Sequence, residues 1–342
     1  MYFANQLIEW YQQNGRILPW RETKNPYHIW LSEIILQQTR VAQGMDYYLR
    51  FVDKYPTLTD LASADLQEVL KLWQGLGYYS RARNLHHTAI DIKENYNEKF
   101  PATFNEIQKL KGIGPYTAAA IASFAFDEKV AVVDGNVFRV LARFFGIFDD
   151  ISLAKTRKIF QELGNDLIQN VNPALFNQAI MDFGATVCKP QNPLCNECVF
   201  TEKCFAYRKN KIEHLPVKNK KISIKNRHFH YLINEDFNEI SISERKENDI
   251  WKGLYEFPKI EEADFRSKEE ILSLFQEKFQ IPAENIVLFK ENVKHKLSHQ
   301  LLMISFWKTT KLMNLPFKKI NKNKLNEYPF PIILWKEVIE KM

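Results

Sequence analysis

The chain has 342 residues, 13% of them aromatic, which allows roughly two domains with substantial cores. Its net charge of +6 permits a polyanionic partner without requiring one. Residues 1–16 lack the basic start and unbroken apolar core of a signal peptide, and the longest apolar run, "AAAIASFAF", is too short for a bilayer, which needs about 20 residues. We therefore expect a cytoplasmic protein with no membrane partner, acting as a monomer.

Helical periodicity dominates the first 200 residues or so. In residues 25–56, Asn25 stands at a plausible N-cap and Pro26 at the first helical position, and apolar residues then recur at three-to-four spacing. Residues 63–96 read as two further helices that are broken by a turn at Gly75 and Gly77. The stretches "LAKTRKIFQELGNDLI" and "PALFNQAIMDFGATVC" continue the helical pattern.

The segment "PATFNEIQKLKGIGPYTAAAIASFAF" predicts two helices joined by a glycine turn. Thr103 and Glu106 form a capping-box pattern, and Pro115 begins the second helix. Gly112 and Gly114 leave the backbone N–H groups of this helix start open to a phosphate oxygen. Taken alone, the pattern is equally compatible with an ordinary helical hairpin whose glycines only permit a tight turn.

All four cysteines lie within residues 188–204, with the spacing C-x6-C-x2-C-x5-C: Cys188, Cys195, Cys198 and Cys204. A reducing compartment disfavours two disulfides and favours a metal site. Structural zinc usually takes two C-x2-4-C pairs, and only the middle pair fits that pattern. The looser spacing therefore favours an iron–sulfur cluster, with zinc left open.

The character of the sequence changes after the cysteines. Residues 207–227 are rich in Lys and Arg and form a basic linker, which lies against an acidic partner or is a solvated tether. Alternating stretches such as "KISIKNRHFHYLI" and "HQLLMISFWKTT" then bound shorter helical ones. We predict a mainly α domain over residues 1–206 and a smaller α+β domain over residues 228–342.

Several of these motifs resemble one enzyme family. "LKGIGPYTAAAIASFAF" is similar to the helix-hairpin-helix of the endonuclease III superfamily of DNA glycosylases, "VAVVDGNVFRVLAR" resembles its catalytic-aspartate segment, and the cysteine spacing matches its [4Fe–4S] loop. "LPWRETKNPYHIWLSEIILQQTRV", "WQGLGYYSRARNLH" and "WKGLYEFP" resemble the MutY-type adenine DNA glycosylases. The resemblance implies a helix-hairpin-helix glycosylase fold with an iron–sulfur loop, followed by a smaller α+β Nudix-like domain.

The same resemblance implies a function. The expected substrate is double-stranded DNA in which adenine is mispaired with 8-oxoguanine or guanine, and the expected reaction is hydrolysis of the adenine N-glycosidic bond in base excision repair. An endonuclease III-like bifunctional glycosylase and AP lyase is the alternative enzyme. A DNA-binding module without catalysis is the alternative from another class.

Two carboxyl groups are the candidate catalytic pair. Glu33 lies in the apolar stretch "IWLSEIILQQ", where burial raises a carboxyl pKa and suits the group to act as an acid. Asp134 precedes a helix, where it can serve as an N-cap and stay ionised. By resemblance, Asp134 stabilises the cationic sugar with help from Tyr116 and Asn136. Because bifunctional relatives carry a Schiff-base lysine in place of Tyr116, we expect little or no lyase activity.

The remaining candidates contact DNA. By resemblance, Gln38 and Tyr78 are the intercalating positions of the family, with Thr39 and Leu76 beside them. The alternative for these four residues is core packing or a polar helix surface.

In the second domain, Leu297, Ser298 and His299 stand where the family has a Phe-Ser-His loop that reads 8-oxoguanine. The stretch is equally compatible with a plain turn before a buried strand. The acidic signature of a Nudix hydrolase is absent, so we expect binding and no hydrolysis in this domain.

Overall fold

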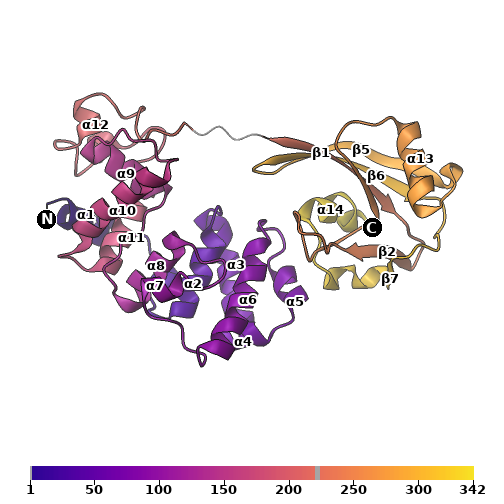
Figure 1. Ribbon diagram of the computed structural model, residues 1–342, viewed down its shortest axis with the longest axis horizontal. Coiled ribbons are helices and arrows are strands. Elements are labelled where there is room, and N and C mark those ends of the chain that lie inside the picture. Colours follow the sequence, from indigo (N-terminus) through magenta and orange to yellow (C-terminus); the bar gives the residue numbers. More distant parts are fainter. Residues whose placement is uncertain (1, 220–223) are drawn as a thin grey trace. The chain divides into compact units, whose positions relative to one another are not determined.

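The computed structural model describes residues 2–219 and 224–342 (Figure 1). Contacts divide these residues into two compact units. The first contains residues 2–63 and 84–219, and the second contains residues 64–83 and 224–342. No helix in the described ranges combines the length and the apolar character needed to cross a membrane.

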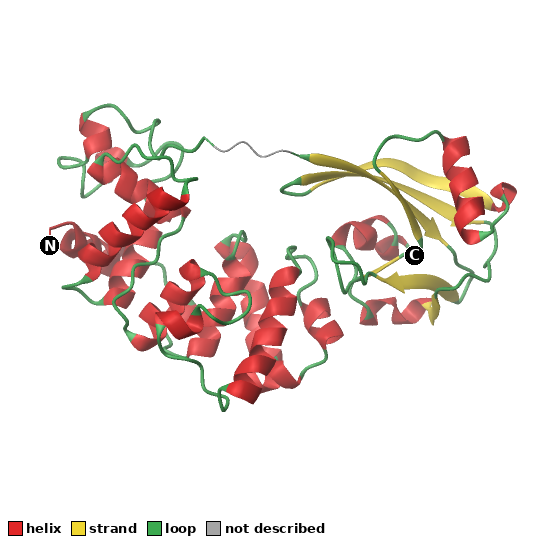
Figure 2. Cartoon of the chain, in the orientation of Figure 1, coloured by secondary structure: helices red, strands yellow, loops and turns green. Residues whose placement is uncertain are grey.

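The first unit is built from helices (Figure 2). They are α1 (Tyr2–Asn14), α2 (Pro26–Leu36), α3 (Val41–Lys54), α4 (Leu58–Ser63), most of α6 (Ser80–Asn95), α7 (Phe104–Ile107), α8 (Pro115–Phe126), α9 (Gly135–Phe145), α10 (Ala154–Ile168), α11 (Pro173–Thr186) and α12 (Phe205–Arg208). Helices α1, α9, α10 and α11 share one core of buried apolar side chains. Gly184 permits the close approach of α11 to α9, because a Cβ added at Gly184 would lie 2.6 Å from the Asn136 Cβ in α9.

Local sequence signals set several helix starts. The Asn25 side chain accepts a hydrogen bond from the Tyr27 N–H at 3.0 Å, so the predicted cap of α2 is confirmed. Pro115 occupies the first turn of α8, also as predicted. The stretch 25–56, expected to be continuously helical, instead breaks between α2 and α3, where Gln38 adopts a left-handed φ of 56°. Such a φ cannot continue a right-handed helix.

The second unit holds two β-sheets and a few short helices. Its elements are α5 (Leu66–Leu72), β1 (Lys225–Ile233), β2 (Glu239–Glu244), β3 (Tyr255–Glu256), β4 (Lys259–Glu262), α13 (Lys268–Phe279), β5 (Ile286–Lys296), β6 (Gln300–Thr309), β7 (Lys318–Asn321) and α14 (Ile332–Glu337). One sheet has the order β4-β1-β6-β5 and the other β3-β2-β7. β1 pairs in parallel with β6, and β5 is antiparallel to β6, so the segment 297–299 is the tip of a hairpin.

Helix α13 covers one face of the larger sheet (Figure 1). Its buried side chains Ile271 and Phe275 pack with Leu232 of β1 and Trp307 of β6. The other face of β1 carries Phe229 and Tyr231, because successive side chains of a strand point to opposite faces. The prediction of a helical domain followed by an α+β domain is confirmed.

The basic linker differs from its sequence interpretation. Residues 220–223 of the predicted linker lie outside the described residues, but the preceding part packs on the helical unit. Leu215 is 2% exposed, and the carbonyls of Leu215 and Ile212 each accept a hydrogen bond from Arg143 at 3.1 Å. Apolar anchors and a buried guanidinium therefore hold this part in place, so it is not a solvated tether. β1 begins at Lys225, within the predicted linker. The domain limits stay a prediction.

Candidate active site and partner-base surface

A pocket of about 390 Å³ in the first unit is lined by all four predicted catalytic residues. Glu33 comes from α2, Tyr116 from the first turn of α8, and Asp134 and Asn136 from the start of α9. Thr39 lines the same pocket from the break between α2 and α3. The volume suits a small organic group such as a single base. Gln38 is exposed and is not among the lining residues.

Glu33 is an unusual carboxyl group because it is only 6% exposed. Burial raises its pKa from 4.5 to about 7, although a hydrogen bond with Tyr116 and the positive charge of Arg21 oppose that rise. The negative charge of Asp134 raises it further. Near neutral pH, Glu33 is therefore divided between its acid and its ionised form, which suits a proton donor.

Asp134 has a different environment. Its Oδ1 accepts hydrogen bonds from the N–H groups of Asn136 and Val137, each at 2.8 Å, and its Oδ2 accepts one from the Asn136 side chain at 2.8 Å. The predicted N-cap is thereby confirmed. Burial nevertheless raises the pKa of Asp134 above its ordinary value, against these hydrogen bonds and the charge of Arg139. The helix start alone therefore does not depress this pKa.

Arg139 connects this helix start to the cysteine loop. Its guanidinium donates to the Asn136 side-chain oxygen at 2.9 Å, to the Gly184 carbonyl at 2.6 Å and to the Cys188 carbonyl at 2.7 Å. The orientation of the Asn136 amide is therefore fixed by α11 and by the segment that contains Cys188.

Tyr116 lies against both carboxyl groups. It shares a hydrogen bond with Glu33. Burial raises the pKa of its phenol well above the ordinary value, and the negative charges of Glu33 and Asp134 raise this pKa further. The phenol is thus a neutral donor in this pocket. The lining residues described include no lysine.

The hairpin before α8 has the geometry expected of a phosphate-binding turn. Gly112 has a φ of 77°, in the left-handed region, and an added Cβ would lie 2.6 Å from the Asn84 side chain. Gly114 is the N-cap of α8, and the space beside its Cα is open. Gly112 is therefore needed for the conformation of the turn, and the open space at Gly114 leaves the start of α8 accessible, while phosphate binding there stays a prediction.

Five other candidates line a second pocket, of about 520 Å³, which lies wholly within the second unit: Leu76, Tyr78, Leu297, Ser298 and His299. The hydroxyl groups of Tyr78 and Ser298 are hydrogen-bonded to one another. Tyr78 is 42% exposed and has a positive φ of 47°, whereas Leu76 is buried. Tyr78 therefore presents an aromatic ring near the hairpin tip, and Leu76 largely packs in the core.

The cysteine loop brings the four thiols within electrostatic reach of one another. All four are partly buried and free of disulfides: Cys188, Cys195, Cys198 and Cys204. Burial raises the pKa of Cys198 to about 11, and the other three thiols contribute to that pKa. The Phe200 N–H donates to the Cys198 Sγ at 3.4 Å, and Arg143 donates to the Cys188 Sγ at 3.5 Å. In the ranges 2–219 and 224–342, no group of three or more His, Cys, Asp or Glu residues is arranged to hold a metal ion.

Comparison with known proteins identifies the family. Residues 31–166 match the HhH-GPD superfamily of base excision DNA repair proteins, and residues 228–338 match the NUDIX domain. The adenine DNA glycosylase of Buchnera aphidicola subsp. Schizaphis graminum is 37% identical over 327 residues, which cover 94% of this chain and 90% of the relative. The chain belongs to the adenine DNA glycosylase family. It is an N-glycosylase of base excision repair.

Other relatives support the same family. The adenine DNA glycosylase of Rattus norvegicus is 46% identical over 216 residues, covering 60% of this chain and 42% of the relative. Among solved structures, a thermostable thymine-DNA glycosylase is 32% identical with a TM-score of 0.56, covering 61% of this chain and 96% of that one. A trapped endonuclease III–DNA covalent intermediate is 24% identical with a TM-score of 0.53, covering 61% and 95%, and shows the shared fold.

The candidate active-site pocket is also lined by residues that the sequence analysis did not single out. Arg16, Arg21 and Gln178 line it. Asp182 of α11 is fully buried and accepts hydrogen bonds from both arginines, at 3.0 Å from the Arg16 Nε and 2.7 Å from the Arg21 Nη2. Burial opposes its ionisation, yet these hydrogen bonds lower its pKa to about 2. Arg21 lies in the motif "LPWRETKNPYHIWLSEIILQQTRV", but Gln178 and Asp182 lie in "PALFNQAIMDFGATVC", which the sequence analysis interpreted only as a helix, and no local pattern marked that helix as a pocket wall.

Proposed function

We propose that this glycosylase removes adenine mispaired with 8-oxoguanine or guanine in double-stranded DNA, as a monomer, by hydrolysis and without cutting the strand. One observation supports the reaction above all others. Glu33 and Asp134 face one pocket from different environments, and the raised pKa of Glu33, about 7, leaves it able to give up a proton near neutral pH.

The proposed chemistry divides the work between the two carboxyl groups. The adenine must leave the base stack to reach the pocket. Glu33 then donates its proton to the departing purine while the N-glycosidic bond breaks. The Asp134 carboxylate stabilises the positive charge that develops on the sugar, and Asn136 holds that carboxylate through its side-chain N–H. A water molecule then adds to the sugar cation and releases a proton, which leaves the hydroxyl group of the abasic site.

Tyr116 supports a hydrolytic product. Its phenol hydrogen-bonds to Glu33 and keeps that carboxyl oriented, but it has no amine with which to attack the sugar and form an imine. The abasic strand should therefore be left intact. The bifunctional lyase needs a lysine in this position, and the lining residues described include none.

The second pocket is proposed to read the partner base. The Ser298 hydroxyl can hydrogen-bond a feature that separates 8-oxoguanine from guanine, and His299 offers a second polar group beside it. Leu297 supplies an apolar contact where the family has phenylalanine. The acidic signature of an active hydrolase is absent from this domain, which supports binding without hydrolysis.

The remaining assignments concern the DNA backbone and the base stack. The N–H groups at Gly112 and Gly114 are proposed to bind a phosphate at the start of α8. Gln38 and Tyr78 are proposed to enter the stack, with Thr39 and Leu76 beside them. The exposure of Gln38 and Tyr78 agrees with this role.

A [4Fe–4S] cluster is proposed as the ligand of the cysteine loop. Four thiols without disulfides, grouped beside the donors Phe200 N–H and Arg143, form a donor set that suits sulfur-bound iron. The ligands would be Cys188, Cys195, Cys198 and Cys204. When bound, the cluster would cross-link the loop at these four points. The carbonyl of one of them, Cys188, accepts a hydrogen bond from Arg139, which also donates to Asn136.

Product analysis tests the reaction directly. Enzyme in excess is incubated with a labelled duplex that contains A:8-oxoguanine, and half of the products is heated in alkali. We expect strand breaks only after alkali, because the enzyme leaves an intact abasic site. Breaks without alkali would show a lyase, and no breaks under either condition would leave only a binding protein. A duplex with T:8-oxoguanine is the matched substrate control.

A further inference from the structure

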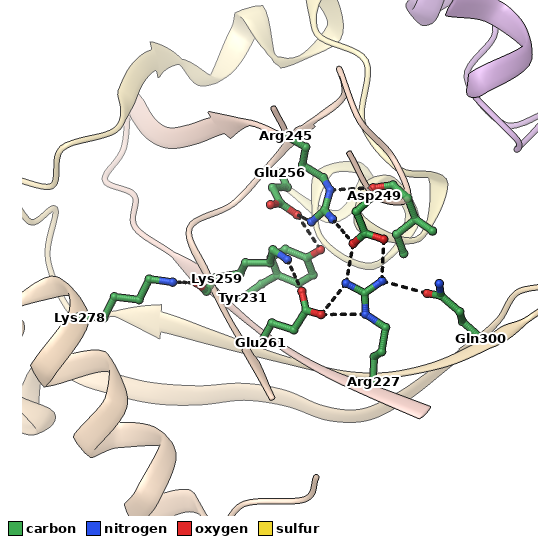
Figure 3. A network of polar contacts seen from close by, with 10 residues as sticks. Arg227, Tyr231, Arg245, Asp249, Glu256, Lys259, Glu261, Lys278 and Gln300 are labelled. Atoms are coloured by element: carbon green, nitrogen blue, oxygen red, sulfur yellow. Dashed lines mark hydrogen bonds and ion pairs between the residues drawn. The ribbon is translucent and has the colours of Figure 1, made fainter. Parts of the chain in front are cut away.

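A network of charged and polar side chains in the second unit includes Gln300, the first residue after the hairpin tip (Figure 3). Arg227 of β1 and Arg245, just after β2, are 7% and 4% exposed. Together with Lys259 they face three carboxylates, so that three positive groups meet three negative ones: Asp249, Glu256 and Glu261. Of these six residues, Arg227, Arg245 and Glu256 are buried, and a buried charge without a partner is costly, so these three depend on their ion pairs.

Two arginines hold the same carboxylate. The Arg227 guanidinium donates to Asp249 Oδ1 at 3.0 Å and to Asp249 Oδ2 at 2.5 Å. Arg245 donates to Asp249 Oδ2 at 3.1 Å. We call these three residues the Asp249 clamp. Paired guanidinium bonds of this kind fix direction as well as distance.

The Asp249 clamp also reaches the hairpin tip. The same Arg227 Nη1 that holds Asp249 donates to the Gln300 side-chain oxygen at 3.0 Å. Gln300 is the first residue of β6, directly after the tip 297–299, and its carbonyl accepts the Leu297 N–H at 2.8 Å. Ser298 and His299 are exposed, so few packing contacts hold this tip. The hydrogen bond from Arg227 to Gln300 is therefore one of the contacts that restrain the hairpin tip.

The other end of the Asp249 clamp holds a strained segment. Trp251 has a left-handed φ of 61°, which a residue with a bulky side chain rarely adopts. Arg245 restrains this segment, because its Nε donates to the Ile250 carbonyl at 2.9 Å. The Trp251 ring lies 5.9 Å from the His295 ring, and both line the pocket that contains Ser298.

We propose that Arg227 is a positioning residue for partner-base recognition: through Asp249 and Gln300 it fixes the Trp251 segment relative to the hairpin tip, and so sets the shape of the pocket that distinguishes 8-oxoguanine from guanine. This inference rests on the proposed recognition by the hairpin tip. Arg227 itself touches no DNA in this account. Its effect is transmitted by the two side chains that share its Nη1 group.

Arg227→Lys tests the proposal with the charge balance preserved. A lysine retains one positive charge, but it cannot bind Asp249 twice and also reach Gln300. Single-turnover excision of adenine opposite 8-oxoguanine should fall about tenfold, the effect of losing about one hydrogen bond, while excision opposite guanine stays within about twofold. Affinity should fall in parallel for a duplex with 8-oxoguanine opposite an uncleavable 2′-fluoro adenine nucleotide.

Arg266→Lys is the matched control. Arg266 also pairs with two carboxylates, Glu262 and Glu270, but it is exposed and lies outside the pocket lining. We expect this variant to keep the wild-type preference for 8-oxoguanine. A merely structural role for Arg227 would instead lower the active fraction, and so reduce excision on both duplexes equally. That result would overturn the proposal.

Gln300→Leu gives a second, independent variant, because it removes only the acceptor at the hairpin tip. It too should lower the preference for 8-oxoguanine, and adding Arg227→Lys to it should cause less loss than Arg227→Lys causes alone, since both variants remove the contact between Arg227 and Gln300. Additive losses would contradict the proposed coupling.

Ser298→Ala separates this inference from the proposed function. If Ser298→Ala lowers the preference but Arg227→Lys does not, the positioning role fails alone. If neither lowers it, recognition by the hairpin tip fails as well. If only Arg227→Lys lowers it, the positioning role holds and Ser298 is not the reading group.

Discussion

Glu33→Gln should make the folded protein more stable, and the gain should grow with pH. Burial raises the Glu33 pKa from 4.5 to about 7, so the folded state retains a proton that the unfolded chain releases. Stability is therefore lost as pH rises from about 4.5 through 7. The loss is about 1 kcal/mol at pH 5.5 and about 3 kcal/mol at pH 8.5, because each pKa unit corresponds to about 1.4 kcal/mol. Glutamine carries no such cost and can still accept the Tyr116 hydrogen bond.

Urea unfolding monitored by tryptophan fluorescence measures this difference. The stability of Glu33→Gln minus that of wild type should increase by about 2 kcal/mol between pH 5.5 and pH 8.5. The control is Glu94→Gln, which neutralises an exposed carboxyl on α6 and should show little dependence on pH. The raised pKa of Glu33 would be refuted if the difference in stability between Glu33→Gln and wild type were the same at both pH values. It would also be refuted if that difference changed with pH no more than the difference for the control does.

Three other predictions concern the lyase position, the cofactor and the partner base. Tyr116→Lys should introduce strand nicking without alkali, because it places an amine beside Asp134; unchanged products would mean that residue 116 does not face the sugar. Protein purified without oxygen should be yellow-brown with broad absorption near about 400 nm and should lose this colour in Cys198→Ser, as for a thiolate-bound cubane; a colourless protein with stoichiometric zinc would disprove the cluster. Ser298→Ala should slow excision opposite 8-oxoguanine about tenfold, the effect of about one hydrogen bond of 1 to 1.5 kcal/mol, with excision opposite guanine nearly unchanged; equal losses on both would remove Ser298 from recognition.

Local signals in the sequence predicted the parts of the fold that depend on neighbouring residues. The caps at Asn25 and Asp134 need only a side chain two or three residues from its partner N–H, so the sequence shows them directly. The strands β1 and β6 followed from alternation of apolar and polar residues. The break between α2 and α3 was missed, because the apolar spacing continues across Gln38 and only its φ of 56° interrupts the helix.

Residues of the candidate active site could be predicted only where they lie in a recognisable sequence motif. The apolar neighbours of Glu33 and the place of Asp134 at a helix start were visible in the sequence, but their catalytic roles were predicted from the resemblance to the glycosylase family. The pocket wall formed by Arg16 and Gln178 depends on α11 packing beside the N-terminal segment. Arg16 is held there by Asp182, which lies more than 160 positions away in the sequence. The same holds for the bond between Arg227 and Gln300. Such pairings are set by tertiary packing, which no local pattern records.

The pH dependence of adenine release tests the central claim that Glu33 is the proton donor. Single-turnover excision from an A:8-oxoguanine duplex is measured between pH 5.5 and 9, for wild type and Glu33→Gln. The wild-type rate should fall as pH rises through about 7, where Glu33 loses its proton. Glu33→Gln should bind the duplex but release no adenine. A wild-type rate that does not change across this range, or release by Glu33→Gln at near the wild-type rate, would contradict the account.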